Sequence, residues 1–360
     1  MSRYSHNELN FLLENFSIAK KEYSLSPLTD GYINDTFLVK EGIAPVYILQ
    51  RINHDVFPNV SGIMNNIEKA FSFLKSDDYH NISLVQTVTG QSYYSHKKEG
   101  ATYWRLMTYM DNSLAHNTTE NPKIAFGAGK IIGEFHRLLS PAKPESFVEI
   151  IPGFHDLNLR KKQFNESLSM RASNRQNTAK NAITFAKNTL ETLKELDHLE
   201  LPLRICHNDT KLNNILFSKK TDQPLCLIDL DTLMSGFFHF DFGDAIRTIV
   251  NTAPEDEQDH GNIVFRRDLF DSFIDGLAMN GAFLTQAEID VLPMGAVLMP
   301  FLHGIRALTD YLNGDVYYKV AYENQNLDRC LSLFDFTQKA LEELDFMKDS
   351  IANRLSTVTL

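Results

Sequence analysis

The most constraining feature of the sequence is a pair of polar segments, each of which adjoins an apolar run. Residues 207–214 read His-Asn-Asp-Thr-Lys-Leu-Asn-Asn and contain the pattern His-x-Asp-x-x-x-x-Asn. Fifteen residues after Asn214, a second apolar run ends in Leu-Ile-Asp-Leu-Asp, which places Asp229 at the end of a predicted strand. The segments 205–215 and 224–231 therefore predict a strand–loop–strand–loop unit with its polar side chains in the loops.

These residue types supply what phosphoryl transfer requires: a base for the acceptor hydroxyl, oxygen ligands for a metal ion and a nearby cation. We predict Asp209 as the base and Lys211 as the cation on the γ-phosphate of ATP. Asn214 and Asp229 are predicted to hold Mg²⁺, which prefers hard oxygen ligands. Asp231 is a further candidate for the metal or the substrate, and a solvated loop acid is the alternative. Either segment alone could be a polar surface loop, but their order and spacing together indicate a kinase.

A second motif competes for the metal role. Asp241 begins an Asp-Phe-Gly tripeptide like the metal-binding tripeptide of protein kinases, but it lies 27 residues after Asn214. That distance is too long for a short hairpin, and we interpret the preceding Gly-Phe-Phe-His-Phe as a turn and an apolar strap. We therefore predict that Asp229 binds the metal and that Asp241 accepts hydrogen bonds from loop amides. His136 and His207 are also predicted to be structural.

Composition restricts the class of protein. A chain of 360 residues usually needs more than one core, so two lobes are expected. The formal net charge of −11 argues against a nucleic-acid partner, whereas Mg²⁺ can offset the charge of ATP. Three cysteines without a CxxC pair favour a reduced, cytoplasmic protein. No signal peptide or run of ~18 apolar residues indicates a membrane partner, and residues 293–302 are predicted to form a buried helix. The oligomeric state is left open.

The texture of the sequence predicts an α+β fold with two lobes. Residues 1–110 are expected to form a β-rich N-lobe with one helix, and residues 111–360 a mostly helical C-lobe. The lobes would join near residues 108–113, leaving a cleft suited to a nucleotide. The expected strands are 32–39, 45–52, 92–96 and 101–107, and the expected helices are 8–19, 60–75, 124–139, 164–196, 269–279, 286–312 and 326–354.

The nucleotide side is predicted from two weaker signals. The polar turn at residues 29–36 contains a glycine that would let backbone amides approach phosphate, although an ordinary hairpin is the alternative. Residues 108–110 would present backbone groups to adenine, and a simple inter-lobe linker is the alternative. The predicted nucleotide-binding residues are Gly31, Asn34, Thr36, Gln50, Thr108, Tyr109 and Met110.

The N-lobe lacks the lysine that kinases usually place on the strand after this turn. The strand offers Gln50 and Arg51 instead, which alternation puts on opposite faces. The sequence leaves open which of them faces the cleft. Arg51 paired with Glu68 of the next helix is one possible replacement for the usual lysine–glutamate pair.

Seven motifs together resemble the aminoglycoside phosphotransferase and choline kinase family, and within it the N-acetylhexosamine 1-kinases. They are Asp-Gly-x-Ile-Asn-x-Thr, Tyr-Ile-Leu-Gln, Ile-Gly-Glu-Phe-His, His-Asn-Asp-Thr-Lys-Leu-Asn-Asn-Ile-Leu, Ile-Asp-Leu-Asp-Thr, Phe-Asp-Phe-Gly-Asp and Asp-Tyr-Leu-x-Gly-Asp-x-Tyr. The resemblance covers nearly the whole chain. It implies a protein-kinase-like fold and ATP- and Mg²⁺-dependent phosphorylation of N-acetylglucosamine or N-acetylgalactosamine at the anomeric hydroxyl. Glutamine in place of the strand lysine departs from the wider family but resembles this branch.

The acceptor site is assigned mainly by this resemblance, which implies that Arg306 and Tyr317 line the sugar site. Arg306 and Asp310 lie four residues apart on one predicted helix, so a structural pair is the alternative. Asp244 could likewise form a pair with Arg247 instead of binding substrate. The predicted substrate-binding residues are Asp231, Asp244, Arg306 and Tyr317.

Other functions remain open at this stage. The same machinery could act on choline, homoserine, an aminoglycoside or a ketosamine. A non-catalytic nucleotide-binding regulator is a second alternative, against which the intact set of Asp209, Asn214 and Asp229 argues. A sulfatase is rejected, because no cysteine or serine is followed by x-Pro-x-Arg.

Overall fold

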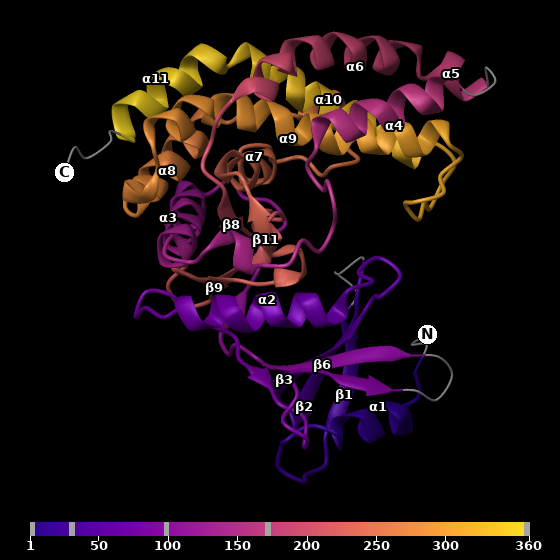
Figure 1. Ribbon diagram of the computed structural model, residues 1–360, viewed down its shortest axis with the longest axis vertical. Coiled ribbons are helices and arrows are strands. Elements are labelled where there is room, and N and C mark those ends of the chain that lie inside the picture. Colours follow the sequence, from indigo (N-terminus) through magenta and orange to yellow (C-terminus); the bar gives the residue numbers. More distant parts are fainter. Residues whose placement is uncertain (1–3, 29–32, 97–100, 170–173, 356–360) are drawn as a thin grey trace.

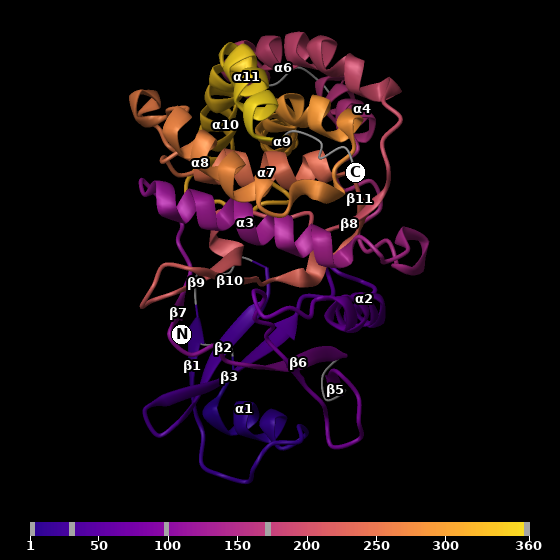
Figure 2. The same cartoon turned by 90° about the vertical axis from the view of Figure 1, so that its left-hand side faces the viewer.

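The computed structural model describes residues 4–28, 33–96, 101–169 and 174–355 of the chain. They form a small N-terminal lobe built on an antiparallel sheet and a larger lobe built mostly of helices (Figures 1 and 2). This architecture confirms the predicted α+β, protein-kinase-like class.

The sheet of the small lobe has six strands in the order β1-β2-β3-β6-β4, with β5 also paired to β6. Gly42, with a φ of +58°, makes the predicted turn between β2 and β3. The sequence pattern did not predict β1, an edge strand that contains Pro27. The strands are β1 (Ser24–Leu28), β2 (Asp35–Glu41), β3 (Ala44–Ile52), β4 (Leu84–Val85), β5 (Tyr94–His96) and β6 (Thr102–Thr108).

Alternation along these strands gives the sheet two unlike faces. Phe37 and Leu49 are paired across β2 and β3 and lie in an apolar cluster with α1 (His6–Leu13). Thr36, one residue before Phe37, is paired with Gln50, one residue after Leu49, so both lie on the opposite face. The structure thus answers which strand residue faces the large lobe, because Gln50 lies on the face away from the apolar cluster.

Helix α2 (Val60–Phe73) packs with the large lobe. Its side chains, including Ile63, belong to the same buried cluster as the strands and helices of that lobe. Asn66 is fully buried and donates to the backbone oxygens of Val148 at 2.7 Å and Leu233 at 2.8 Å. It also accepts a bond from the Val148 amide at 2.9 Å. We expected this helix to be part of the N-lobe, but its packing joins it to the large lobe.

The large lobe stacks helices over short strands, with α3 lying across β10 and α9 between α7 and α10 (Figures 1 and 2). Strands β7 and β10 flank β9, and β8 pairs with β11. The single helix predicted over 326–354 is divided at Glu343. The strands are β7 (Ser113–Leu114), β8 (Arg204–Cys206), β9 (Ile215–Ser218), β10 (Pro224–Leu227) and β11 (Met234–Gly236). The helices are α3 (Pro122–Leu139), α4 (Leu157–Ser169), α5 (Asn174–Thr178), α6 (Lys180–Thr192), α7 (Phe238–Ile249), α8 (Arg267–Ala278), α9 (Gln286–Leu312), α10 (Gln325–Glu342) and α11 (Leu344–Arg354).

Helix α7 corrects the interpretation of residues 236–240. These residues are neither a turn nor an apolar strap, because Gly236 ends β11 and Phe238 begins the helix. Phe238 and Phe242 lie one helical turn apart and are both buried. The helix carries Asp241 to residues 207–214, which are called the catalytic loop below.

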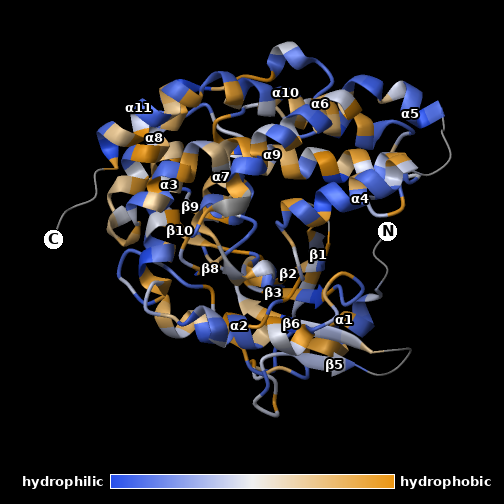
Figure 3. Ribbon diagram, turned by 45° about the horizontal axis from the view of Figure 1, so that its top comes forward, coloured by the Kyte–Doolittle hydropathy of each residue, from blue (hydrophilic) through white to orange (hydrophobic). Residues whose placement is uncertain are grey.

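Helix α9 is the long apolar helix of the core. It begins at a capping box formed by Thr285 and Glu288. By length and composition it could cross a membrane, but 83% of its most apolar stretch is buried inside the protein. Figure 3 shows apolar residues recurring along α9 beneath α10. The buried helix predicted at residues 293–302 is the middle of α9.

Candidate active site

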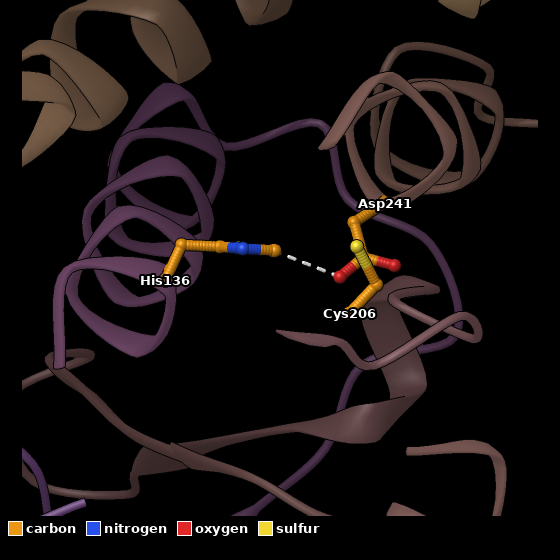
Figure 4. A group of neighbouring side chains, drawn as sticks. All are labelled: His136, Cys206 and Asp241. Atoms are coloured by element: carbon orange, nitrogen blue, oxygen red, sulfur yellow. Dashed lines mark hydrogen bonds and ion pairs between the residues drawn. The ribbon is translucent and has the colours of Figure 1, made fainter. Parts of the chain in front are cut away.

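A buried carboxylate holds the start of the catalytic loop. Asp241 accepts hydrogen bonds from the backbone amides of His207 at 2.8 Å and Asn208 at 2.7 Å. Figure 4 shows a third bond, from the ring of His136 at 2.8 Å. Its backbone oxygen accepts from the Thr210 hydroxyl at 2.5 Å. These bonds confirm Asp241 as an acceptor for loop amides and His136 as a structural residue.

The same carboxylate belongs to a group of three potential metal ligands, His136, Cys206 and Asp241, whose ligand atoms lie within 4.8 Å of one another (Figure 4). Both oxygens of Asp241 already accept hydrogen bonds. Burial also raises the pKa of the Cys206 thiol well above its ordinary value, which disfavours the thiolate that binds metals. We therefore interpret this group as structural.

His207 and Asn208 connect the two predicted loops. The His207 ring bonds to the backbone oxygen of Ile228, the residue before Asp229, at 2.8 Å. Asn208 has a left-handed φ of +62°, and its side chain donates to the backbone oxygen of Thr232 at 3.0 Å. The sequence-distant loops are therefore fixed to each other, and His207 has the bracing role that we predicted.

Asp209, Lys211 and Asn214 form a compact polar cluster. Lys211 Nζ lies 2.9 Å from Asp209 Oδ2, and Asn214 Nδ2 lies 3.0 Å from the same oxygen. Burial works to lower the pKa of Lys211, but Asp209 and Asp229 outweigh it and raise that pKa. Both bonds to the Asp209 side chain end on Oδ2, so Oδ1 is the oxygen that can accept a bond from a substrate hydroxyl. The amide nitrogen of Asn214 is engaged, which leaves its oxygen as a possible metal ligand.

Asp229 adds negative charge beside this cluster. It adopts a left-handed conformation with a φ of +62° and keeps contact with solvent. The surrounding protein nevertheless removes part of its hydration, and together with Asp231 and Asp209 this raises the pKa of Asp229 to about 6. Oxygen ligands from Asn214 and Asp229, set among excess carboxylates, fit the chemistry of Mg²⁺.

Asp231 is bound by the small lobe. Arg105, on β6, donates to one oxygen of Asp231, and Asn34 donates to the other at 2.7 Å. Arg105 also donates twice to the side-chain oxygen of Gln50, at 2.9 and 2.5 Å, and the nitrogen of Gln50 donates to Thr36 Oγ1 at 3.0 Å. Both oxygens of Asp231 are therefore engaged with the small lobe, not with the acceptor region. Sequence reasoning missed Arg105, whose partner lies far along the chain.

Arg51 lies on the other face of β3. Its side chain donates to Asp35 Oδ2 at 2.6 Å, in register across β2 and β3. The alternative in which Arg51 pairs with Glu68 is therefore wrong. Gly31, predicted to approach the phosphates, lies outside the described residues.

The connection between the lobes borders a cavity of about 380 Å³. Thr108, Tyr109 and Met110 line it, together with residues that follow α2 and one residue of β10. No described residue of the catalytic loop lines this cavity. The cavity therefore lies beside the connection and not over the polar cluster of Asp209, Lys211 and Asn214. Leu216 is half-buried between the fully buried Ile215 and Phe217 of β9 and packs against the cluster to which they belong.

A buried ionic network stands next to the catalytic loop. Arg247 Nε bonds to Asp244 Oδ1 at 2.7 Å, and His303 lies 3.3 Å from the same oxygen. Burial works to raise the pKa of Asp244, but Arg247 and His303 hold it below its ordinary value. No described group bonds to the other oxygen, Oδ2. Asp244 thus forms the structural pair weighed as the alternative, yet one buried oxygen lacks a described partner.

Arg306 lies over aromatic rings. Its guanidinium carbon is 5.4 Å from the ring centre of Phe154 and 5.9 Å from that of Tyr317. The neighbouring His155 bonds through its ring to the backbone oxygen of Asn208 at 3.1 Å, which ties this surface to the catalytic loop. The structure thus brings Arg306 and Tyr317 together near the loop that carries Asp209.

Asp310 has a different role from the pair considered for it. Its carboxylate accepts bonds from the backbone amides of Val316, Tyr317 and Tyr318 at 2.7–3.0 Å. It therefore fixes the loop that carries Tyr317, and the Arg306–Asp310 pair is not formed.

Comparisons with known proteins agree with this geometry. A family model described as the phosphotransferase enzyme family matches residues 24–271, which is more than half of the chain. The fold is shared with a microcompartment-associated aminopropanol kinase, at a TM-score of 0.64 and 17% identity, over 96% of this chain and 99% of that one. It is also shared with an amicoumacin kinase bound to AMP-PNP and Ca²⁺, at 0.63 and 14%, over 95% and 94% of the two chains.

A third solved structure, a spectinomycin phosphotransferase bound to ADP and spectinomycin, has a TM-score of 0.60 and 11% identity, with 97% of this chain and 100% of that chain covered. At such identities the structures share the fold alone, whereas the family model matches the sequence itself. The matched residues include the catalytic loop, Asp229 and both lobes' strands. The chain is therefore a phosphotransferase that belongs to the phosphotransferase enzyme family.

Proposed function

We propose that this phosphotransferase is an ATP- and Mg²⁺-dependent kinase that phosphorylates the anomeric hydroxyl of N-acetylglucosamine or N-acetylgalactosamine. The observation that carries the proposal is the orientation of Asp209. Lys211 and Asn214 both bond to its Oδ2, and the remaining oxygen can accept the acceptor's hydroxyl proton.

In this mechanism each residue has one task. Asp209 Oδ1 accepts a hydrogen bond from the sugar hydroxyl and takes its proton as the oxygen attacks the γ-phosphorus of ATP. Lys211 stabilises negative charge on the transferred phosphoryl group. Asn214 and Asp229 would hold Mg²⁺, which neutralises phosphate charge when bound. The bond from the γ-phosphorus to the bridging oxygen breaks, and ADP leaves.

The nucleotide is placed between the lobes on the catalytic side of the connection. The related structures that contain AMP-PNP or ADP support this choice of co-substrate. Leu216 and the half-buried Ile228, which directly precedes Asp229, provide an apolar surface for the adenine. Backbone groups of residues 108–110 are proposed to bond the adenine edge.

Two arginines near Tyr317 weigh against a cationic acceptor at that place. The guanidinium groups of Arg306 and Arg160 lie close enough that Arg306 helps to lower the pKa of Arg160, although burial lowers it more. A choline or aminoglycoside ammonium would meet this positive charge. A neutral sugar can instead stack on Phe154 or Tyr317. The motifs shared with N-acetylhexosamine 1-kinases point to the same class of substrate.

The test is an ADP-release assay with ATP, Mg²⁺ and a panel of acceptors: N-acetylglucosamine, N-acetylgalactosamine, choline, homoserine, an aminoglycoside and a ketosamine. We expect turnover with the two N-acetylhexosamines and a product whose phosphorus NMR signal belongs to a sugar 1-phosphate. A 6-phosphate product, or turnover only with another acceptor, would overturn the sugar assignment. Nucleotide binding without turnover of any acceptor would identify a regulator instead.

A further inference from the structure

A row of three polar side chains crosses the small-lobe sheet on the face opposite its apolar cluster. Thr36, Gln50 and Arg105 are direct partners across β2, β3 and β6. Their sheet neighbours Phe37 and Leu49 point the other way into the apolar cluster. The row therefore faces the large lobe, where the phosphates of a bound nucleotide would lie.

Arg105 fixes the orientation of the Gln50 amide. Its Nε and Nη2 both donate to Gln50 Oε1, which directs the amide nitrogen away from the guanidinium. That nitrogen carries two hydrogens, and the bond to Thr36 Oγ1 uses one of them. A second N–H of Gln50 is thus available as a donor in the position where kinases usually place a phosphate-binding lysine.

The third nitrogen of the Arg105 guanidinium, Nη1, holds the turn that follows Asp229, the proposed metal ligand. Arg105 Nη1 donates to Asp231, and each of these residues is only 2% exposed. Asp231 belongs to the short 3-10 helix Leu230–Thr232 that follows Asp229 directly. Asp229 adopts a left-handed conformation, and the bond from Arg105 to Asp231 adds to the bonds from His207 and Asn208 that hold this turn. One side chain from β6 therefore orients the Gln50 N–H that would donate to the nucleotide and also holds the turn that carries Asp229, a proposed metal ligand.

We infer that Arg105 is a positioning residue for nucleotide and metal binding, acting through Gln50 and through Asp231. The Arg105–Asp231 pair would replace the lysine–glutamate pair of other kinases, with the cation one strand further along the sheet and the anion beside the metal aspartate instead of on α2. This inference rests on the proposed function as far as nucleotide and Mg²⁺ binding are concerned, and it is independent of the acceptor.

Arg51 provides a matched control. It is also a mostly buried arginine of this sheet with a carboxylate partner, but it lies on the opposite face and bonds to Asp35. Loss of Arg51 removes an ion pair of the same sheet, whose partner Asp35 is 40% exposed, without touching Gln50 or Asp231. An effect common to both arginines therefore reports on the stability of the sheet. A loss of ADP affinity that is confined to Arg105 and spares adenosine reports on positioning.

The experiment compares the full-length wild-type protein with R105Q, R105K and R51Q by calorimetric titration. ADP is titrated over a series of Mg²⁺ concentrations, adenosine is titrated separately, and the melting temperature of each variant is recorded. We expect R105Q to weaken ADP binding about tenfold or more, as loss of charge-assisted hydrogen bonds does, and to raise the Mg²⁺ concentration for half-maximal binding. Adenosine affinity should stay within about twofold, because adenosine has no phosphates.

R105K keeps the charge but cannot reproduce the forked contact, so we expect partial recovery of ADP binding. If R105Q does not fold, R105K alone must still show a loss specific to ADP. Equal losses for ADP and adenosine, or an R51Q effect as large as that of R105Q, would overturn the inference and leave the kinase proposal standing. Failure of the wild type to bind either ligand would overturn both.

Discussion

At the scale of single residues, the site depends on how each carboxylate is shared. One oxygen of Asp209 accepts bonds from Lys211 and Asn214, and we propose that the other receives the acceptor hydroxyl. Asp241 has both oxygens engaged in holding the loop, and Asp231 has both engaged with the small lobe. Three acidic residues close together therefore have different roles, which their hydrogen-bond partners define.

The first prediction concerns the base. The D209N variant should lose about 100-fold or more in kcat, because the amide cannot take the acceptor's proton. ADP binding should be unchanged, since the substitution is isosteric. Steady-state kinetics and ADP titration measure the two effects. Activity above a tenth of wild type would remove Asp209 from the role of base.

The second prediction separates the two candidate metal aspartates. D229A should abolish activity and Mg²⁺-dependent ADP binding while the melting temperature falls little. D241A should instead destabilise the fold, because two loop amides and His136 lose their acceptor at about 1–3 kcal/mol per unpaired buried group. Urea unfolding and Mg²⁺ titrations distinguish the variants. The opposite pattern would make Asp241 the metal ligand.

The third prediction concerns a buried histidine outside the catalytic cluster. Burial lowers the pKa of His239 to about 4. Between pH 6.5 and 4 the unfolded chain therefore binds a proton that the folded protein does not, so the free energy of unfolding falls as the pH is lowered through this window. At pH 5, His239 lowers the free energy of unfolding by on the order of 2 kcal/mol relative to neutral pH.

The H239Q variant has no proton to bind and should lose less stability than the wild type between pH 7 and pH 5. Urea unfolding at the two pH values gives both differences, and any cost of the substitution that is independent of pH cancels. Identical pH dependence in the two proteins would mean that burial does not shift the pKa of His239 from its unfolded value.

At the scale of secondary-structure elements, the helices α7 and α9 meet at two glycines. A Cβ at Gly243 would lie 2.0 Å from the backbone oxygen of Gly295, so the close approach of the helices requires glycine there. This contact sets how deeply α7 lies beneath α9. It also sets the position of Asp241, two residues earlier, under the catalytic loop.

We therefore predict that G243A lowers the free energy of unfolding by about 2 kcal/mol or more, since overpacking against a backbone cannot be relieved by rotating a side chain. G281A is the matched control, because the Cβ added there would meet only the ends of two flexible side chains, Leu355 at 3.2 Å and Leu284 at 3.9 Å. Urea unfolding of both variants tests the difference. A G243A protein as stable as G281A would show that the helices can separate freely.

The sequence predicted some elements better than others for physical reasons. The catalytic loop was readable because Asp209 and Asn214 lie close together in the chain and their chemistry fixes their spacing. The sequence did not predict helix α7, because polar side chains occupy its buried face. There Asp241 accepts hydrogen bonds from loop amides and Asp244 forms an ion pair with Arg247. The Arg105–Asp231 pair was unreadable because 126 residues separate its members.

At the scale of the whole molecule, the boundary between the buried apolar clusters does not coincide with the boundary between the two lobes. Most buried apolar residues of the sheet share a cluster with α1, whereas α2, together with Ile52 at the end of β3, belongs to the cluster of the large lobe. Periodicity revealed that residues 60–75 form a helix, but it could not reveal which lobe the apolar face contacts. Asn66 fixes this partnership through bonds to backbone groups of the large lobe.

The fifth prediction follows from this division. In a native-state hydrogen-exchange experiment, the central amides of α2 should have the protection of α3 and not that of β2 and β3. N66A should reduce protection in α2, because the buried backbone groups of Val148 and Leu233 lose their partner. Exchange of α2 in step with the sheet would contradict this picture.

Because the hydrogen bonds of Asn66 fix α2 to the large lobe, a rotation of the sheet relative to that lobe would leave α2 in place. Any rocking of the sheet has to be absorbed in the short stretches on either side of that helix and in the connection after β6. The strands would then move relative to α2 and the large lobe, and the residues of the large lobe that we propose to bind the acceptor would keep their positions during a turnover.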